Sequence, residues 1–344
     1  MCSVTRWSEN GVAEVVARNM DWVEDLKSNL WLFPRGMKRE GLAGKNSMMW
    51  TSKYGSVITS AYDIASTDGI NEKNLAGHLL WLAESDYGKR DESLPGLSLS
   101  LWLQYFLDNF ASVNEAVNSV ENHPFQLLPT KAGDTGKVAQ IHMIIEDSTG
   151  DAAVFEYING KLEIHHGRQY IVMTNDPSFD KQIESLKQYK GFGGNKSLPG
   201  TTQSADRFTR GAYYQKNLPK PNNIRETIAG VISVARNMAQ PFGSPDPVRP
   251  NISSTRWRTV SDLTNGVYFF ESTTSPNIIW VILRKLNFEK GSPVKKLDLV
   301  NEPDRIGDVS AEFQDFKPFE DQTILTTNKE ILYYINIDQQ IPDN

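Results

Sequence analysis

The order of strand-like and helix-like segments is the feature that most constrains the fold of this chain. Strand-like runs come first, and a helix-like run, further strands, two helix-like runs and a last set of strands follow. Strand and helix do not alternate strictly, so the order predicts antiparallel sheets layered with helices. No internal repeat or linker divides the sequence, and we expect a single domain over residues 1–344.

Apolar residues in these segments recur either at every second position or at helical spacing. The expected strands are residues 13–22, 29–34, 48–62 with a break at Gly55, 75–82, 139–145, 152–158, 161–166, 169–174, 267–271, 278–283 and 331–337. The expected helices are residues 97–120, 206–215 and 224–238. Asn159-Gly160 indicates a type I′ hairpin, residues 131–137 a polar loop, and residues 67–72, with Asp68-Gly69 at their centre, a turn.

Cys2 is the only cysteine among the 344 residues, and removal of Met1 would make it the first residue. A terminal cysteine carries a thiol and a free α-amine on the same residue. The amine, with a reference pKa of roughly 8, can take the thiol proton and later return it to a leaving group. The position therefore predicts an N-terminal nucleophile; the alternative is a cysteine that packs as a small buried hydrophobe.

Such a nucleophile needs charged groups that tune it. Arg18 and Asp21 are expected to flank a sharp turn at the end of the strand at 13–22. A guanidinium near Cys2 would stabilise a thiolate, and a carboxylate would orient the amine. The alternative for this pair is an ion pair on the surface.

Two further polar residues are candidates for the same site. Asn175 follows the expected strand at 169–174, so its amide would project at a sheet edge as a neutral donor for an oxyanion. An asparagine there is otherwise an ordinary turn former. Arg207 lies in the first turn of an expected helix, where a cation opposes the helix dipole. That local cost indicates a carboxylate partner elsewhere in the chain.

Several classes of function find no support in the sequence. The net charge is −6 without a basic stripe, so we expect no nucleic-acid partner. No apolar run reaches 18 residues, so we expect no membrane span. The five histidines lack metal-ligand spacing, and no phosphate-binding glycine loop occurs, so we expect neither a metal nor a cofactor. A Cys/His dyad that uses one of these histidines is the rival mechanism.

Six segments together resemble the choloylglycine hydrolase family, a group of N-terminal-nucleophile hydrolases that contains penicillin V acylases and conjugated bile salt hydrolases. They are Cys2 after Met1 and residues 18–22, 50–56, 68–73, 172–175 and 253–258. The similarity extends from Cys2 to about Leu299 in the family's order and approximate spacing. It implies an α+β fold, a four-layer αββα sandwich of two antiparallel sheets covered by helices, with Cys2 exposed once Met1 is lost.

The resemblance also implies roles. Cys2 would be the nucleophile and its amine the base, Arg18 and Asp21 would support them, and Arg207 would be the second arginine of the site. Asn175 would be one oxyanion donor.

The second oxyanion donor of the family aligns with Trp81. Typical bile salt hydrolases carry asparagine there and Gram-positive penicillin V acylases carry tyrosine. Trp81 has no side-chain amide, so its backbone N–H would have to serve. Trp81 and Trp22 are more similar to the Gram-negative branch, and their indole faces would suit a phenoxyacetyl ring or a flat acyl stem.

The function that the resemblance implies is a cysteine-nucleophile amidohydrolase that cleaves a small-molecule acyl amide in the manner of a penicillin V acylase. Relatives in the Gram-negative branch also cleave N-acyl homoserine lactones, an activity known as quorum quenching. The alternatives are a conjugated bile salt hydrolase and a ligand-binding relative without turnover. The resemblance further implies a homo-oligomer, either a tetramer or a dimer, and a periplasmic location. The absence of a signal, taken literally, indicates the cytoplasm instead.

Overall fold

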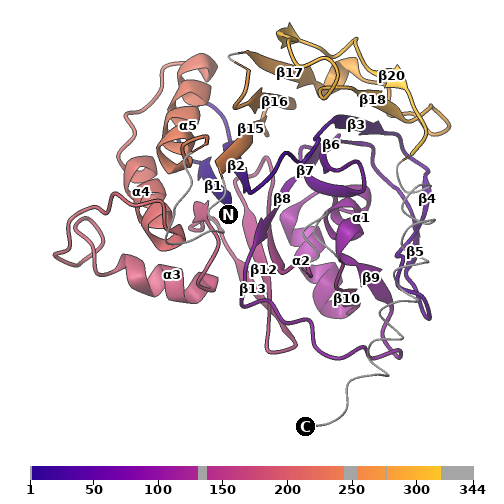
Figure 1. Ribbon diagram of the computed structural model, residues 1–344, viewed down its shortest axis with the longest axis horizontal. Helices are drawn as coiled ribbons and strands as arrows, with labels where there is room; N and C mark the ends of the chain where they lie inside the picture. The colour runs from indigo at the N-terminus through magenta and orange to yellow at the C-terminus, as the bar shows by residue number, and fades with distance from the viewer. Residues whose placement is uncertain (1, 131–137, 244–253, 276, 319–344) are drawn as a thin grey trace.

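The structure is a computed structural model that describes residues 2–130, 138–243, 254–275 and 277–318. Two large β-sheets lie face to face, and each carries helices on its outer face (Figure 1). This arrangement confirms the expected α+β class and four-layer αββα sandwich. None of the helices in these ranges is both long and apolar enough to span a bilayer.

Sheet A has seven strands and holds the N-terminal strand next to one edge. In spatial order its strands are β14 (Val172–Met173), β1 (Cys2–Trp7), β2 (Val15–Trp22), β15 (Ser254–Asp262), β16 (Val267–Ser272), β17 (Ile278–Ile282) and β19 (Gly307–Asp308). All neighbours are antiparallel except β17 and β19. Because β1 lies between β14 and β2, groups from both neighbours can reach Cys2.

Sheet B has nine strands, and all its neighbours are antiparallel. In spatial order they are β13 (Lys161–His166), β12 (Ala152–Ile158), β11 (Ile141–Glu146), β8 (Ala76–Trp81), β7 (Ala65–Asn71), β6 (Ser56–Ala61), β3 (Leu30–Phe33), β18 (Lys295–Leu297) and β20 (Gln314–Asp315). Both central residues of the Asn159-Gly160 turn have positive φ, 50° and 73°, which confirms the expected hairpin between β12 and β13.

The helices divide between the two outer faces (Figure 1). Sheet A is covered by α4 (Ser204–Lys216) and α5 (Ile224–Met238), and sheet B by α1 (Trp102–Asn109) and α2 (Val113–Asn122). Helix α3 (Phe179–Leu186) packs against α4 and contacts β12 and β13 of sheet B. The remaining elements are short: β4 (Lys38–Glu40) paired with β5 (Met49–Thr51), β9 (Gly96–Ser98) paired with β10 (Gln126–Leu128), η1 (Leu99–Leu101) and η3 (Leu283–Lys285). The helices expected at 206–215 and 224–238 are confirmed as α4 and α5.

The helix expected at 97–120 is wrong in its extent. Residues 96–98 form strand β9, and the helical part divides into α1 and α2 at Phe110, whose backbone is extended. Ser112 accepts a hydrogen bond from the backbone N–H of Glu115, and the Glu115 carboxylate accepts one from the backbone N–H of Ala111. These two hydrogen bonds cap the start of α2, because they satisfy backbone N–H groups that have no partner within a helix.

The turn expected at 67–72 is also wrong. Asp68 and Gly69 lie inside strand β7, and the chain turns only after Asn71. A Cβ added at Gly69 would lie 2.7 Å from the Ile58 side chain and 2.7 Å from the Val57 carbonyl oxygen. The glycine is therefore required by the close approach of β6, not by a turn conformation.

The other expected strands have mixed outcomes. Those at 13–22, 29–34, 75–82, 139–145, 152–158, 161–166, 267–271 and 278–283 are confirmed, and residues 48–62 divide at Gly55 into β5 and β6. Residues 169–174 contribute only the two-residue strand β14, and β15, which no expected strand covers, is the longest strand described. The loop expected at 131–137 and the strand expected at 331–337 lie outside the described residues.

The layer between the sheets contains a group of buried charges within a mostly apolar core. The Asp68 carboxylate contacts His78 Nδ1 at 2.6 Å and accepts a hydrogen bond from the Tyr268 hydroxyl at 2.6 Å. On its other side, His78 Nε2 lies 3.4 Å from a Glu146 oxygen. Burial alone would lower the pKa of His78, but the two carboxylates raise it to about 9. His78 is therefore a buried cation at neutral pH.

We predict that His78 contributes stability that depends on pH. Its pKa is 6.5 when unperturbed and about 9 in the fold, so folding favours the protonated ring. The contribution is complete below pH 6.5 and is lost as pH rises through 9, and it amounts to about 3 kcal/mol. Urea unfolding of the native chain and of His78→Gln from pH 6 to 10 measures it. A difference in unfolding free energy that does not shrink over this range would contradict the prediction.

Candidate active site

Cys2 begins strand β1 and is 3% exposed. It pairs with Met20 on β2, and both residues pack in the core between the sheets. Its Sγ lies 3.5 Å from Nη2 of Arg18 and 3.7 Å from Sδ of Met20. The thiol therefore faces the inner layer, where a guanidinium is its nearest charged neighbour.

Arg18 and Asp21 lie inside strand β2, so the sharp turn expected between them is wrong. The ladders of β2 with β1 and with β15 both continue through this stretch, which fixes an extended backbone. Residues three apart in a strand point to opposite faces. Arg18 therefore contacts Cys2 from the inner layer, whereas Asp21 lies on the face covered by helices. Neither residue forms the surface pair considered as the alternative, because both are fully buried.

Asp21 is held by three groups on the helix side of sheet A. Its carboxylate accepts hydrogen bonds from Thr255 Oγ1 at 2.6 Å and from Gln240 Nε2 at 3.3 Å, and Nη1 of Arg207 lies 3.5 Å away. Burial raises the pKa of Asp21, and the Arg207 guanidinium opposes that rise. The sequence did not single out Thr255 or Gln240 by role, although Thr255 lies in one of the family-like segments.

Arg207 joins the groups around the N-terminal residue. Nη1 donates to the Cys2 carbonyl oxygen at 2.7 Å, and Nη2 donates to Oδ1 of Asn175 at 2.9 Å. The side chain is fully buried, and burial lowers its pKa while the Asp21 carboxylate raises it. The carboxylate partner that the helix position indicated is therefore Asp21.

Asn175 lies just beyond strand β14, at the edge of sheet A, and it is fully buried. Its Oδ1 accepts hydrogen bonds from the backbone nitrogen of Cys2 at 2.5 Å and from Arg207. Its Nδ2 donates to the carbonyl oxygen of Trp81 at 2.7 Å. The structure thus brings the two expected oxyanion donors together, and their role in catalysis stays a prediction.

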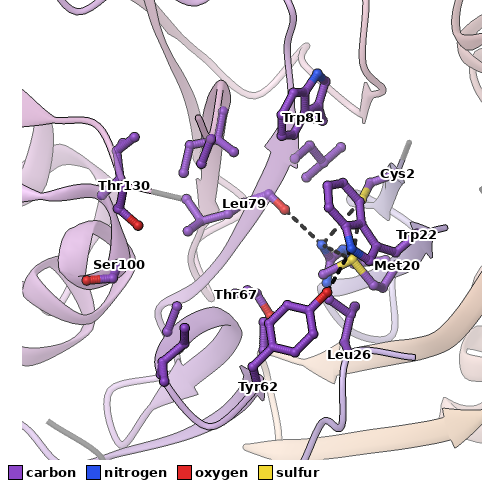
Figure 2. A pocket seen from close by; sticks show the side chains of 18 residues that line it. Cys2, Met20, Trp22, Leu26, Tyr62, Thr67, Leu79, Trp81, Ser100 and Thr130 are labelled. Atoms are coloured by element: carbon purple, nitrogen blue, oxygen red, sulfur yellow. Dashed lines mark hydrogen bonds between the residues drawn. The ribbon is translucent and has the colours of Figure 1, made fainter. Parts of the chain in front are cut away.

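A pocket opens beside Cys2 between the two sheets (Figure 2). Its cavity volume is about 130 Å³. Sheet A supplies Cys2, Arg18, Met20 and Trp22, and the rest of the wall comes from sheet B and its neighbouring segments: Leu26, Ala61, Tyr62, Ile64, Ala65, Thr67, Leu79, Leu80, Trp81, Leu99, Ser100, Thr130, Ala139 and Ile141. Most of these side chains are apolar, which suits an apolar acyl group.

Trp22 and Trp81 both line the pocket, and their role in substrate binding stays a prediction. Their ring centroids are 5.6 Å apart and their planes are tilted by 45°. The indole N–H of Trp22 donates to the Tyr62 hydroxyl at 3.0 Å, and that hydroxyl donates to Glu24 at 2.5 Å. Tyr62 therefore orients Trp22, a function that no sequence signal indicated.

One group in the described part of the chain brings three metal-ligating atoms within 4.8 Å of one another, namely Glu163, His165 and Asp180. It lies on β13 and α3 and contributes no residue to the pocket wall. Two of its members are exposed side chains, and His165 contacts Asp180 at 3.5 Å. This group therefore lies apart from the pocket beside Cys2.

Comparison with known sequences places the chain in a family. Residues 2–296 match the linear amide C-N hydrolases of the choloylglycine hydrolase family. The chain is 46% identical over 329 residues to a penicillin V acylase of Pectobacterium atrosepticum, with 89% of this chain and 87% of that protein covered. It is 24% identical over 324 residues to a bile salt hydrolase/transferase of Clostridium perfringens, with 86% and 96% covered.

Solved structures agree with this placement. A penicillin V acylase from Agrobacterium tumefaciens matches with a TM-score of 0.84 and 47% identity, over 92% of this chain and 98% of that chain. The C2A mutant of the conjugated bile acid hydrolase from Clostridium perfringens matches with a TM-score of 0.73 and 24% identity, over 86% and 96%, which is a likeness of fold. The chain therefore belongs to the choloylglycine hydrolase family and is a linear amide C–N hydrolase.

Proposed function

We propose that this hydrolase cleaves penicillin V-like acyl amides with the Cys2 thiolate as its nucleophile. One observation carries the proposal: the single thiol of the chain lies 3.5 Å from a buried guanidinium at the wall of an apolar pocket. A cation at this distance favours the thiolate, which is the reactive form. The names of the two penicillin V acylases that are 46% and 47% identical support the choice of substrate.

The proposed reaction passes through a thioester. The Cys2 thiolate attacks the amide carbonyl carbon, a C–S bond forms, and the carbonyl oxygen becomes an oxyanion that accepts hydrogen bonds from Asn175 and the backbone N–H of Trp81. The C–N bond breaks as the α-amine of Cys2 gives its proton to the departing nitrogen. Water then attacks the thioester, which releases the carboxylic acid and restores the thiol.

This scheme requires that Met1 be removed. The backbone nitrogen of Cys2 becomes the α-amine only after that cleavage, and it already lies within hydrogen-bond distance of Asn175 Oδ1. Asn175, with its own oxygen held by Arg207, would then orient the base of the reaction.

Kinetics on three substrates test the proposal. Penicillin V, a long-chain N-acyl homoserine lactone and glycodeoxycholate are compared side by side, and we expect kcat/KM to be highest for penicillin V with measurable turnover of the lactone. The Trp22 and Trp81 rings narrow the pocket beside Cys2, which favours a flat phenoxy ring or a linear chain over a steroid. A preference for glycodeoxycholate would overturn this ranking and make the chain a bile salt hydrolase.

We predict that Trp81→Leu raises KM for penicillin V about tenfold while kcat changes less, because an aromatic contact of this kind contributes roughly 1 kcal/mol or more to binding. The matched control is Trp280→Leu, which removes an indole on β17 that contacts Phe269 and does not line the pocket. Equal effects of the two substitutions on KM would exclude a role of Trp81 in binding the acyl group.

A further inference from the structure

The Arg18 guanidinium lies between the Cys2 sulfur and the Asp68 carboxylate, and only Cys2 takes part in the proposed chemistry. Nη2 donates to the Leu79 carbonyl oxygen at 2.8 Å and lies 3.5 Å from Cys2 Sγ. Nη1 lies 3.7 Å from Oδ2 of Asp68 and, among the described residues, has no hydrogen-bond partner. The carboxylate thus forms an ion pair with Arg18 but accepts no hydrogen bond from Nη1.

Both oxygens of Asp68 have other partners, which fix the position of the carboxylate. Oδ2 contacts His78 Nδ1 at 2.6 Å, and Oδ1 accepts a hydrogen bond from the Tyr268 hydroxyl at 2.6 Å. Tyr268 comes from β16 of sheet A, and its hydroxyl is also 2.7 Å from Thr59 Oγ1 of sheet B. These side chains are at most 1% exposed, so water does not weaken the contacts.

We infer that His78 and Tyr268 are positioning residues for the amide hydrolysis, and that they act through Asp68 on Arg18. By fixing both carboxylate oxygens, they hold Asp68 at 3.7 Å from Arg18 and keep it from drawing the guanidinium into a hydrogen bond. Nη2 of Arg18 then remains beside the Cys2 sulfur. The inference rests on the proposed role of Cys2 as nucleophile.

Charged groups face Cys2 and His78 from several neighbouring elements. Arg18 faces Cys2 from β2 on the inner layer, and Arg207 faces its backbone from α4 on the helix side. Glu146 on β11 faces His78 from the side opposite to Asp68. A change in thiol reactivity after a substitution at Tyr268 is therefore expected to act through Asp68 and Arg18.

The first test is Tyr268→Phe, which removes one hydroxyl and keeps the ring. Asp68 Oδ1 then loses its hydrogen bond from Tyr268, and the carboxylate can move to accept one from Arg18. We expect kcat for penicillin V to fall at least about tenfold with KM within about twofold. Alkylation of the single cysteine by iodoacetamide should reach half its maximal rate about one pH unit higher than in the native chain.

The second test is a rescue. In Tyr268→Phe combined with Asp68→Asn, the neutral amide no longer attracts Arg18, so the pH dependence of alkylation should return toward that of the native chain. Additive damage in the double variant would overturn the inference, as would an unchanged alkylation profile in Tyr268→Phe. If Tyr268→Phe does not fold, His78→Gln, which frees Oδ2 instead, is measured by the same criteria.

The matched control is His142→Gln. His142 is fully buried in the same sheet, and its Nδ1 contacts Glu156 at 2.7 Å, but the pair has no contact with Arg18. We expect its alkylation profile to equal that of the native chain, and a shift equal to that of Tyr268→Phe would count against the inference. Alkylation requires no turnover, so these results are distinct from a failure of the proposed function, which retained activity in Cys2→Ser would reveal.

Discussion

Cys2→Ser is expected to lower kcat/KM for penicillin V by at least about 10³-fold while the fold is retained. The two side chains differ by one atom, and Cys2 Sγ packs against Met20 and Arg18. A serine at this position can make the same contacts. A serine hydroxyl beside the same guanidinium remains protonated near neutral pH. The substitution therefore removes the nucleophile and keeps the structure.

Three measurements make this result interpretable. Thermal unfolding should show a melting temperature close to that of the native chain, and intact mass should show that Met1 is absent from both proteins. Initial rates on penicillin V then report the chemistry alone. Turnover by Cys2→Ser at the native rate would exclude the thiolate mechanism, and Met1 retained in an active native chain would exclude the α-amine as the base.

Arg207→Met is expected to lower both stability and activity. The substitution leaves the Asp21 carboxylate buried without its cation and leaves the Cys2 carbonyl oxygen and Asn175 Oδ1 without their donor. Removing one partner of a buried ion pair costs about 3 to 5 kcal/mol in unfolding free energy. We also expect kcat/KM to fall at least about 10²-fold, because Asn175 and the N-terminal residue lose the group that holds them in place.

The effect should depend on pH with a definite sign. Burial already raises the pKa of Asp21, and loss of Arg207 removes the main opposing charge. Because the neutral carboxyl costs less to bury, the destabilisation should be largest near neutral pH and smaller at acidic pH. Arg210→Met is the matched control: this arginine lies in the same helix and binds Asn237 and the Thr201 carbonyl, away from Cys2. Equal losses of activity in the two variants would contradict the role given to Arg207.

The sequence predicted the layers and most of the strands because period-two alternation reports directly on burial. The prediction failed where one short sequence pattern is compatible with two different backbone structures. Asp68-Gly69 has the composition of a turn, yet Gly69 is there because β6 lies too close for a side chain, and Asp68 is a buried ion-pair partner. The charges of Arg18 and Asp21 likewise favour a turn, because two charges seldom occur within a buried strand.

The candidate site could be assembled from the sequence only through the family resemblance. Composition indicated the importance of Cys2, but the contact between Asp21 and Arg207 joins residues 186 positions apart, a separation that no local pattern reports. The partners that hold these groups, such as Thr255, Gln240 and Tyr62, are ordinary polar residues. Their role depends on which distant side chains the fold brings next to them. Ser112 and Glu115, in contrast, carried a readable helix-start signal that separates α1 from α2.

The two halves of the sandwich contribute unequally to the wall of the pocket and to the groups around the thiol. The thiol, its guanidinium and the carboxylate behind them belong to strands of sheet A, whereas all but four residues of the wall come from sheet B and the segments next to it. Natural variation in the wall residues outside sheet A can therefore alter which acyl group is accepted while Cys2, Arg18 and Asp21 are inherited unchanged. The same separation gives protein engineers a route to new acyl selectivity, since libraries restricted to wall residues outside sheet A, other than Trp81, leave the thiol and its partners intact.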